Sequence, residues 1–371
     1  LLQECLANGV IRLHDSDHLR RAPTALPPDF DFQKIEGMLL GLAIGDALGA
    51  PTEGMLPLER RRAHGEIRDF LPSRHDELGS IGAVTDDSQL AFWTLEQFIE
   101  DGGLVPDHLA RKFCADHIRG IGNTVRTFIG RYKDEGLPWQ LAGVDSLGNG
   151  ALMRIAPILV PHVQSPKASL YADAALDAML THNAYANVAG CVAFVHILWQ
   201  LLAMRRPPEP EWWIETFVAT ARDLEGSTCY RPRHAAMASY EGPLWRFVQA
   251  QCLGALDQRT PVVEACDVWG SGAHLTETLP SVLFILATHG HNPEAAILRA
   301  VNDTKDNDTI AAIVGAAVGA LHGLAGLPRR WVQGLDGRIR KGGKSDVFRL
   351  TLQAKQVFWL QHQGGAAMDE A

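Results

Sequence analysis

The chain has 371 residues, of which 46% are hydrophobic and 21% are charged, and its formal net charge is -9. This composition is typical of a globular protein, and the length suits one large domain or two ordinary ones. Phosphate binding needs clustered cations and the sequence has no long Lys/Arg run, so we expect neither nucleic acid nor an anionic membrane as a partner. We interpret the short run Arg60, Arg61 and Arg62 as a solvated face.

Residues 1–33 differ in character from the rest of the chain. They show little periodicity and end in the proline-rich RAPTALPPDFDF, which predicts an N-terminal arm and a stiff connector ahead of one domain over 34–371. No charged segment followed by an apolar run and a small-residue cleavage site is visible, so we expect no secretory signal. The six cysteines lack CxxC spacing, which predicts reduced thiols and a cytoplasmic location.

From Lys34 onward, apolar residues recur at helical spacing, as in 35–42, 90–99 and 176–180, and alternating strand patterns are scarce. Helix breakers cluster at 148–150, 205–211, 269–272 and 289–293. Medium helices joined by short loops are therefore expected. Two apolar stretches, 188–204 and 309–328, lack an aromatic belt or basic flank, so we interpret both as core helices and not as membrane spans.

Glycines recur four residues apart in two of the expected helices, at 37, 41 and 45 and again at 315, 319 and 323. On a helix this spacing places the glycines on one face, at a propensity cost of about 1 kcal/mol each. Each stripe predicts a groove where another backbone can approach closely.

Asp303, Asp306 and Asp308 stand directly before the apolar helix expected after residue 308. One acid at a helix N-terminus is explained by capping, which contributes about 1 kcal/mol. Capping does not explain Asp306 and Asp308 together with Thr309, and on this stretch alone both interpretations stay open.

The same arrangement occurs a second time, since Thr85, Asp86 and Asp87 precede another apolar-faced helix. If the two helix starts face each other, four carboxylates and two hydroxyls come together, and cations must neutralise them. Such hard oxygen ligands favour Mg²⁺ or Mn²⁺, and neither the histidines nor the cysteines have zinc-ligand spacing. The sequence therefore predicts a site for two divalent cations.

Six segments in register resemble the successive motifs of the ADP-ribosylglycohydrolase family. In chain order they are GMLLGLAIGDALGAPTEG, VTDDSQLAFW, SLGNGALMR, THNAY, WGSGAHLTETLP and NDTKDNDTIAAIVGAAVGALHG, and they span residues 34 to about 330. The resemblance implies an all-α fold, a single large orthogonal multi-helix bundle with a binuclear metal cleft, with the arm lying outside it. It also implies hydrolysis of the glycosidic bond that joins ADP-ribose to a protein side chain.

By motif position, the resemblance assigns metal ligands and catalytic groups. The metal ligands would be Thr85, Asp86, Asp87, Asp306, Asp308 and Thr309. Glu53 would match the family's mobile glutamate near the scissile bond, although a solvated loop acid is the alternative, and Asp46 would orient the metal ligands. We expect water activated between paired cations to attack the anomeric carbon, with Asp86, Asp87 or Glu53 accepting its proton.

The resemblance also assigns substrate-binding residues. They are Gly148, Asn149, Gly150, Met153, His182, Trp269, Gly270, Ser271 and Gly272. Bare amides of the 148–150 loop would approach the diphosphate, and the Trp269 ring would stack on a base or shape the ribose pocket. His182 would contact ADP-ribose, although a core histidine with satisfied hydrogen bonds is the alternative.

Two departures from the family pattern bear on specificity. Asn183 and Ala184 follow His182 where an Asp is usual, and Lys305 stands where a Gly pair is common. The expected substrate is an ADP-ribosylated protein, with ADP-ribosyl-arginine favoured. A second interpretation is an immunity protein whose arm blocks an ADP-ribosyltransferase toxin, and a third is that the arm packs on its own core.

Overall fold

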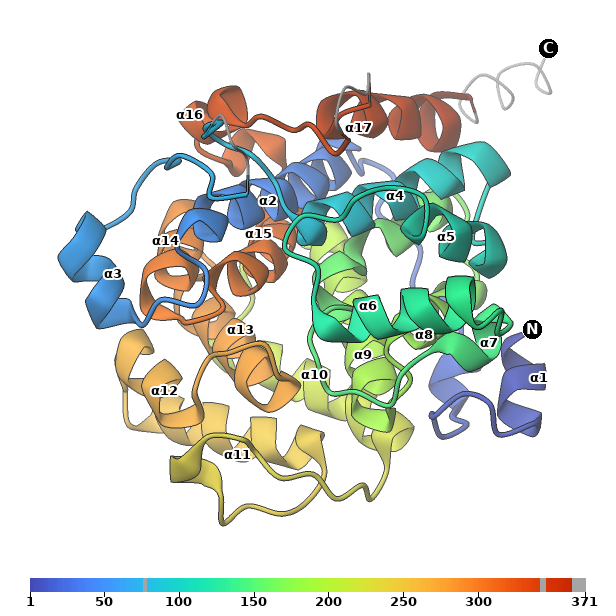
Figure 1. The fold of residues 1–371 in the computed structure, drawn as a ribbon, viewed down its shortest axis with the longest axis horizontal. Coiled ribbons are helices and arrows are strands. Elements are labelled where there is room, and N and C mark those ends of the chain that lie inside the picture. Colours follow the sequence, from blue (N-terminus) through green and yellow to red (C-terminus); the bar gives the residue numbers. More distant parts are fainter. Residues whose placement is uncertain (76–78, 341–344, 362–371) are drawn as a thin grey trace.

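The computed structural model describes residues 1–75, 79–340 and 345–361. In these ranges the regular structure is helical, and extended segments meet only as isolated bridges such as Pro72 with Ile81. Figure 1 shows the helices crossing one another around a shared interior. The all-α prediction is confirmed.

The helices follow one another along the whole described chain. They are α1 (Leu2–Ala7), α2 (Gln33–Gly49), α3 (Pro57–His64), α4 (Asp86–Asp101), α5 (Pro106–Phe113), α6 (Asn123–Ile129), α7 (Trp139–Ala142), α8 (Ser169–Thr181), α9 (Tyr185–Ala203), α10 (Pro210–Glu225), α11 (Leu244–Asp257), α12 (Val262–Trp269), α13 (Leu275–His289), α14 (Pro293–Asp303), α15 (Asn307–His322), α16 (Arg329–Gly334) and α17 (Val347–Lys355). Short 3-10 turns include Ala50–Thr52, Leu152–Arg154 and Ala156–His162. The predicted breakers at 205–211, 269–272 and 289–293 separate α9 from α10, α12 from α13, and α13 from α14.

Helices α2 and α15 pack side by side at the centre of the molecule (Figure 1). A Cβ atom on Gly41 would lie 2.2 Å from the carbonyl oxygen of Gly315, and one on Gly319 would lie 2.0 Å from the carbonyl oxygen of Gly37. Only glycine permits so close an approach of two backbones. The two glycine stripes therefore meet each other, and this contact sets where the acidic start of α15 lies.

Both long apolar stretches form buried helices, but the second was predicted too long over 309–328, because α15 ends at His322 before Gly323, whose φ is 71°, and Ala325 and Gly326 are exposed. The part of α15 from Asn307 to Leu321 is buried along its whole length. Among the described helices, α9 alone is long and apolar enough to cross a membrane by length and composition, and 83% of its 18-residue apolar stretch is buried inside the protein. All six cysteines are free thiols.

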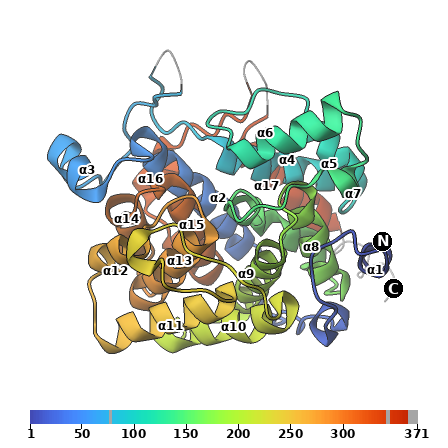
Figure 2. The same cartoon turned by 60° about the horizontal axis from the view of Figure 1, so that its bottom comes forward.

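The N-terminal arm packs against its own core, with α1 at the edge of the molecule beside α8 (Figure 2). Leu2, Cys5, Ile11, Leu13 and Leu19 are buried there. Polar contacts hold the arm as well. The Asn183 side chain accepts from the Arg12 amide at 2.9 Å and donates to the Val10 carbonyl at 2.8 Å. Asn183, one of the departures from the family pattern, thus anchors the arm.

Candidate metal centre

Two helix starts face one cleft. Thr85 precedes α4 and Asp306 precedes α15, and neither side chain makes a capping hydrogen bond. A Cβ atom on Gly49, the last residue of α2, would lie 2.4 Å from the Cα atom of Asp308. The glycine contact between α2 and α15 thus brings the acids of α15 beside the end of α2, and capping does not account for them.

The cleft has a volume of about 250 Å³, and five carboxylates line it. They come from Glu53, Asp86, Asp87, Asp306 and Asp308, and Thr309 lies among them. Ligand oxygens of Glu53, Asp306 and Asp308 lie within 4.8 Å of one another. Thr85 is buried behind this wall and is not part of the lining.

The chemistry of the cluster fits divalent cations. Burial raises the pKa values of Asp86, Asp87 and Asp308 well above the usual value, and neighbouring carboxylates raise them further. Burial raises the pKa of Asp306 to about 7. Asp87 Oδ1 is buried with no hydrogen-bond partner. A buried orphan oxygen among mutually repelling carboxylates is a poor arrangement for a metal-free protein and a suitable one for Mg²⁺ or Mn²⁺.

Asp46 on α2 holds the start of α4. It accepts hydrogen bonds from the Thr85 hydroxyl at 2.6 Å and from the Ser88 hydroxyl at 2.5 Å. The backbone amides of Thr85 and Ser88 donate to the same carboxylate at distances between 2.9 and 3.1 Å. Asp86 and Asp87 lie between these two residues, so Asp46 orients the segment that carries them.

The 148–150 loop supports the cleft in a way that the sequence did not predict. Asn149 donates through Nδ2 to Asp306 Oδ2 at 2.5 Å and to Thr278 Oγ1 at 3.0 Å. The Gly148 amide donates to Ser146 Oγ at 3.0 Å, and the Asn149 amide donates to the Ala273 carbonyl at 3.2 Å. Two of the three amides expected to meet a diphosphate are therefore already bonded within the protein.

His182 lies under this loop and lines the cleft. A Cβ atom on Gly150 would lie 2.8 Å from its Cε1 atom, so the glycine is needed for the ring to fit. Burial lowers the pKa of His182 to about 3, and Nδ1 lies 2.9 Å from Thr181 Oγ1. The ring is thus neutral and held in place at the wall of the cleft. Gly148, Gly150 and Met153 line the same wall.

The segment from Trp269 to Gly272 does not reach the cleft lining. The Trp269 ring is enclosed between helices, with Nε1 donating to Ser281 Oγ at 2.8 Å, so the expected stacking on a ligand base is not available to it. Ser271 instead accepts hydrogen bonds from the backbone amides of Lys305 and Asp306, at 3.2 and 2.9 Å. Its role in the structure is to hold the segment that leads into α15.

The interpretation of Arg60 as solvated is wrong, because its side chain is fully buried, whereas Arg61 and Arg62 are exposed as expected. Its guanidinium donates to the Thr304 carbonyl at 2.7 Å, the Met55 carbonyl at 2.9 Å and Thr52 Oγ1 at 3.0 Å. The burial of Arg60 was not predictable from the sequence, because the pattern of a short helix does not indicate which distant segments pack against that helix. Arg60 joins the segment on both sides of Glu53, at Thr52 and Met55, to the segment before Asp306.

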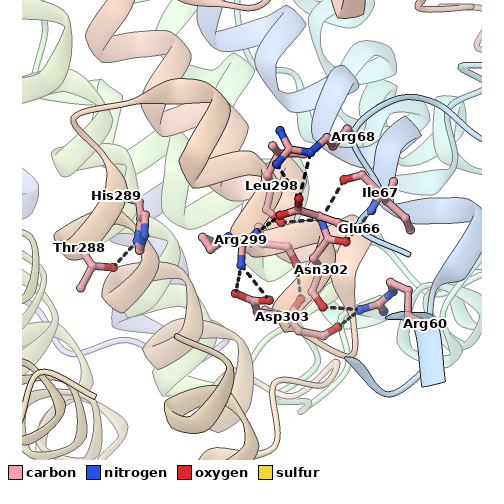
Figure 3. Close-up of polar contacts among 12 residues, drawn as sticks. Arg60, Glu66, Ile67, Arg68, Thr288, His289, Leu298, Arg299, Asn302 and Asp303 are labelled. Atoms are coloured by element: carbon pink, nitrogen blue, oxygen red, sulfur yellow. Dashed lines mark hydrogen bonds and ion pairs between the residues drawn. The ribbon is translucent and has the colours of Figure 1, made fainter. Parts of the chain in front are cut away.

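Figure 3 shows the surroundings of this contact at the end of α14. Arg60 points toward Asn302, whose carbonyl accepts a hydrogen bond from it at 3.2 Å. Asp303 points instead toward Arg299, which donates to it at 3.0 Å. Asp303 therefore belongs to an ion pair, whereas Asp306 and Asp308 face the cleft.

Glu53 lies at the mouth of the cleft and is partly exposed. Its carboxylate pairs with Arg74, and its backbone carbonyl accepts a hydrogen bond from the same guanidinium at 2.8 Å. Lys305 is exposed, and its carbonyl accepts from the Gly54 amide at 2.9 Å. The Glu53 loop is thus tied both to Arg74 and to the segment before Asp306.

Sequence reasoning also missed part of the cleft wall. Gly120, Gly122, Asn123 and Thr124 line it, as do Ser146, Arg233 and Ala273. The glycine-rich turn before α6 is a signal that could have indicated the first group. Arg233 lies in the irregular segment between α10 and α11, where the residue types alone indicate nothing.

The protein is all-α and has a carboxylate-lined cleft at two helix starts. These features place it in the class of candidate metal-dependent hydrolases. The family model described as ADP-ribosylglycohydrolase matches residues 27–362. The chain therefore belongs to the ADP-ribosylglycohydrolase family, and most of the arm lies outside the match.

Individual relatives and a solved structure are similar to most of the chain. The chain is 31% identical to an uncharacterized protein of Archaeoglobus fulgidus, over 82% of this chain and 92% of that one. It is 27% identical to the ADP-ribosylarginine hydrolase Tri1 of Pseudomonas putida, over 85% and 77% of the two chains. A solved structure, an ADP-ribosylglycohydrolase-related protein complex, has a TM-score of 0.64 at 25% identity and covers 88% of this chain and 97% of its own.

Proposed function

We propose that this glycohydrolase removes ADP-ribose from arginine side chains of modified proteins, using two divalent cations held by the acids of the cleft. The observation that carries the proposal is the convergence of four buried carboxylates, those of Asp86, Asp87, Asp306 and Asp308, on one cleft. No Lys or Arg forms an ion pair with any of the four in the described part of the chain. Similarity to a relative named as an ADP-ribosylarginine hydrolase supports arginine as the acceptor.

The position of each residue in the cleft suggests its role in the reaction. Asp86, Asp87, Asp306, Asp308 and Thr309 present oxygen atoms to the cations. When bound, Mg²⁺ or Mn²⁺ would neutralise these acids and polarise oxygen atoms of the substrate and of water. Thr85 would not present its hydroxyl to a cation, because that hydroxyl already donates a hydrogen bond to Asp46 near the end of α2. Its role would be to hold, together with Asp46, the start of α4.

Glu53 is the candidate for proton transfer. It lies at the mouth of the cleft, with its oxygens near those of Asp306 and Asp308, and it is the most exposed of the five acids. A carboxylate there can accept a proton from water as the bond at the anomeric carbon breaks. The surrounding carboxylates would stabilise the positive charge that develops on the ribose.

The immunity role lacks a specific observation in its favour. The apolar side chains of the arm are buried in the chain's own core, so the arm does not present them to a partner. Substrate assignment therefore depends on the cleft.

The test is incubation of the protein with arginine-ADP-ribosylated and serine-ADP-ribosylated proteins, with and without Mg²⁺, followed by mass spectrometry of released ADP-ribose. We expect release from the arginine-linked substrate in the presence of Mg²⁺ only. The Asp308→Asn variant is the matched control and should release none. Release from the serine-linked substrate alone would overturn the arginine assignment, and release from neither would overturn the proposed function.

A further inference from the structure

Among the described residues that line the acid cleft, Arg233 is the only arginine or lysine. The other basic group there is His182, and it is neutral because burial lowers its pKa to about 3. All the remaining charged groups of the lining are the five carboxylates. Among the side chains of the described lining, Arg233 is therefore the one whose permanent positive charge can attract an anionic ligand.

The Arg233 guanidinium is exposed and available. In the described part of the chain no protein group forms a hydrogen bond or an ion pair with it. Arg231, two residues earlier in the same segment, is instead paired with Glu241, to which it donates at 2.5 Å. The segment between α10 and α11 thus carries one arginine that is neutralised within the protein and one that faces the cleft.

Several other polar donors of the cleft lining are already bonded within the protein. The amides of Gly148 and Asn149 are bonded to Ser146 Oγ and the Ala273 carbonyl. The Asn149 side chain donates to Asp306 and Thr278. The hydroxyls of Thr124 and Ser146 are bonded to each other at 2.8 Å. A guanidinium has five N–H donors in a planar fork, which suits phosphate oxygens.

Arg233 lies at the side of the cleft formed by the start of α13. Ala273 lines the cleft there, immediately before the first turn of that helix. The charge of Arg233 acts on His274 and Glu277 of the same segment. Ala273 joins this side of the cleft to the 148–150 loop, because its carbonyl accepts a hydrogen bond from the Asn149 amide.

We propose that Arg233 binds the diphosphate of the ADP-ribosyl group and so orients the substrate, with its reacting ribose toward the carboxylates. The inference rests on the proposed function for the identity of the ligand. Under this proposal Arg233 is a substrate-binding residue. By holding the diphosphate, it determines that the reacting ribose, and not the adenosine, lies against the carboxylates. A neutral ribosyl compound without phosphate would lose this orientation.

The experiment compares Arg233→Gln, Arg233→Lys and the matched control Arg231→Gln with the unchanged protein. Binding of free ADP-ribose and of ADP is measured by titration calorimetry in Mg²⁺, and kcat and KM are measured on the arginine-linked substrate. We expect Arg233→Gln to weaken binding of both ligands and to raise KM about 10-fold to 100-fold, with a much smaller change in kcat. Arg233→Lys should recover part of the affinity, and Arg231→Gln should change none of these quantities.

The two proposals fail in different ways. If Arg233→Gln binds ADP-ribose and ADP as tightly as the unchanged protein, the diphosphate assignment is overturned even when hydrolysis is intact. An equal loss in Arg231→Gln would also overturn it, because the effect would then be one of net charge. If the unchanged protein binds ADP-ribose but hydrolyses no ADP-ribosylated protein, the proposed function fails, while the binding comparison still decides the role of Arg233.

Discussion

Thr85 donates its hydroxyl hydrogen to Asp46 Oδ1 at 2.6 Å, and this bond joins the start of α4 to the end of α2. The same carboxylate accepts from the Ser88 hydroxyl at 2.5 Å. One buried acid thus holds both sides of the segment that carries Asp86 and Asp87. The acids of the cleft are oriented by a further acid on α2 that does not itself line it.

Replacing Asp46 tests this support. Asp46→Asn presents an amide nitrogen where a carboxylate oxygen now accepts two hydrogen bonds, so Asp86 and Asp87 should lose their fixed orientation. We expect Mg²⁺ affinity and kcat to fall about 10-fold to 100-fold, as for other residues that orient metal ligands. Calorimetric Mg²⁺ titration and initial rates provide the measurement. Asp346→Asn is the control, because Asp346 caps α17 and asparagine caps a helix equally well.

Removal of metal should reveal the cost of the buried acids. Mg²⁺ or Mn²⁺ should stabilise the EDTA-treated protein by about 2.7 kcal/mol per site at a concentration of 100 times Kd. In Asp308→Asn we expect this stabilisation and the activity to be lost, while the metal-free variant melts no lower than the metal-free parent, because one buried charge is gone. Thermal melting with and without cation measures both effects. Full activity after EDTA treatment would contradict the proposed role of the acids.

Arg60 should matter for activity beyond its contribution to stability. Arg60→Met leaves the carbonyls of Thr304 and Met55 without their donor, and we expect the free energy of unfolding to fall by about 3 kcal/mol. The segment around Glu53 and the segment before Asp306 should also lose their common anchor, so kcat should fall at temperatures where the variant is still folded. Arg60→Lys keeps the charge and should recover part of kcat. Arg61→Met, an exposed neighbour on α3, should behave like the parent.

The glycine contact between α2 and α15 predicts opposite effects for two similar substitutions. In Gly41→Ala the new Cβ would lie 2.2 Å from the Gly315 carbonyl oxygen, so the helices must separate, at a cost of about 3 kcal/mol. In Gly254→Ala on α11 the new Cβ meets nothing within 4 Å, so stability should rise by about 0.5 kcal/mol. Denaturant unfolding measures both values. Equal effects of the two substitutions would show that α2 and α15 are not in close contact.

The arm should detach in acid. His18 packs on Tyr171 with ring centroids 4.5 Å apart and on His196 at 4.8 Å. Burial, with the charge of Arg21, lowers the pKa of His18 below its usual 6.5, although Asp223 opposes the shift, and burial lowers that of His196 to about 4. Because the docked form favours neutral rings, docking is most stable above pH 6.5 and weakens as the pH falls from 6.5 toward the lowered pKa values.

Hydrogen exchange of residues 1–26, corrected for the intrinsic rate at each pH, measures this effect. We expect faster exchange of the arm at pH 5 than at pH 7.5. His18→Phe keeps a ring on Tyr171 without a titrating group, so its arm should show a smaller difference between the two pH values. An unchanged pH dependence in that variant would assign the effect to other groups.

Much of the helical structure was predictable because it is local. The apolar spacing at 35–42 and 90–99 falls within α2 and α4, and the proline and glycine clusters mark the observed ends of α9, α12 and α13. Each signal lies within one or two turns of the chain. The environment of Arg60 and of Trp269 was not predictable in this way, since each depends on segments far away in sequence.

The sequence by itself determined which residues could serve as hard oxygen ligands, that they stand at two helix starts, and that glycine stripes leave room for a close backbone contact. These are properties of residue type and of the 3.6-residue helical period. Only the tertiary structure decided that the two stripes meet each other, that Asp303 turns to Arg299, that the Gly148 and Asn149 amides are already bonded, and that Arg233 lines the same cleft as the acids. Burial and hydrogen-bond partners arise between distant segments, and no local pattern specifies which segments will pack together.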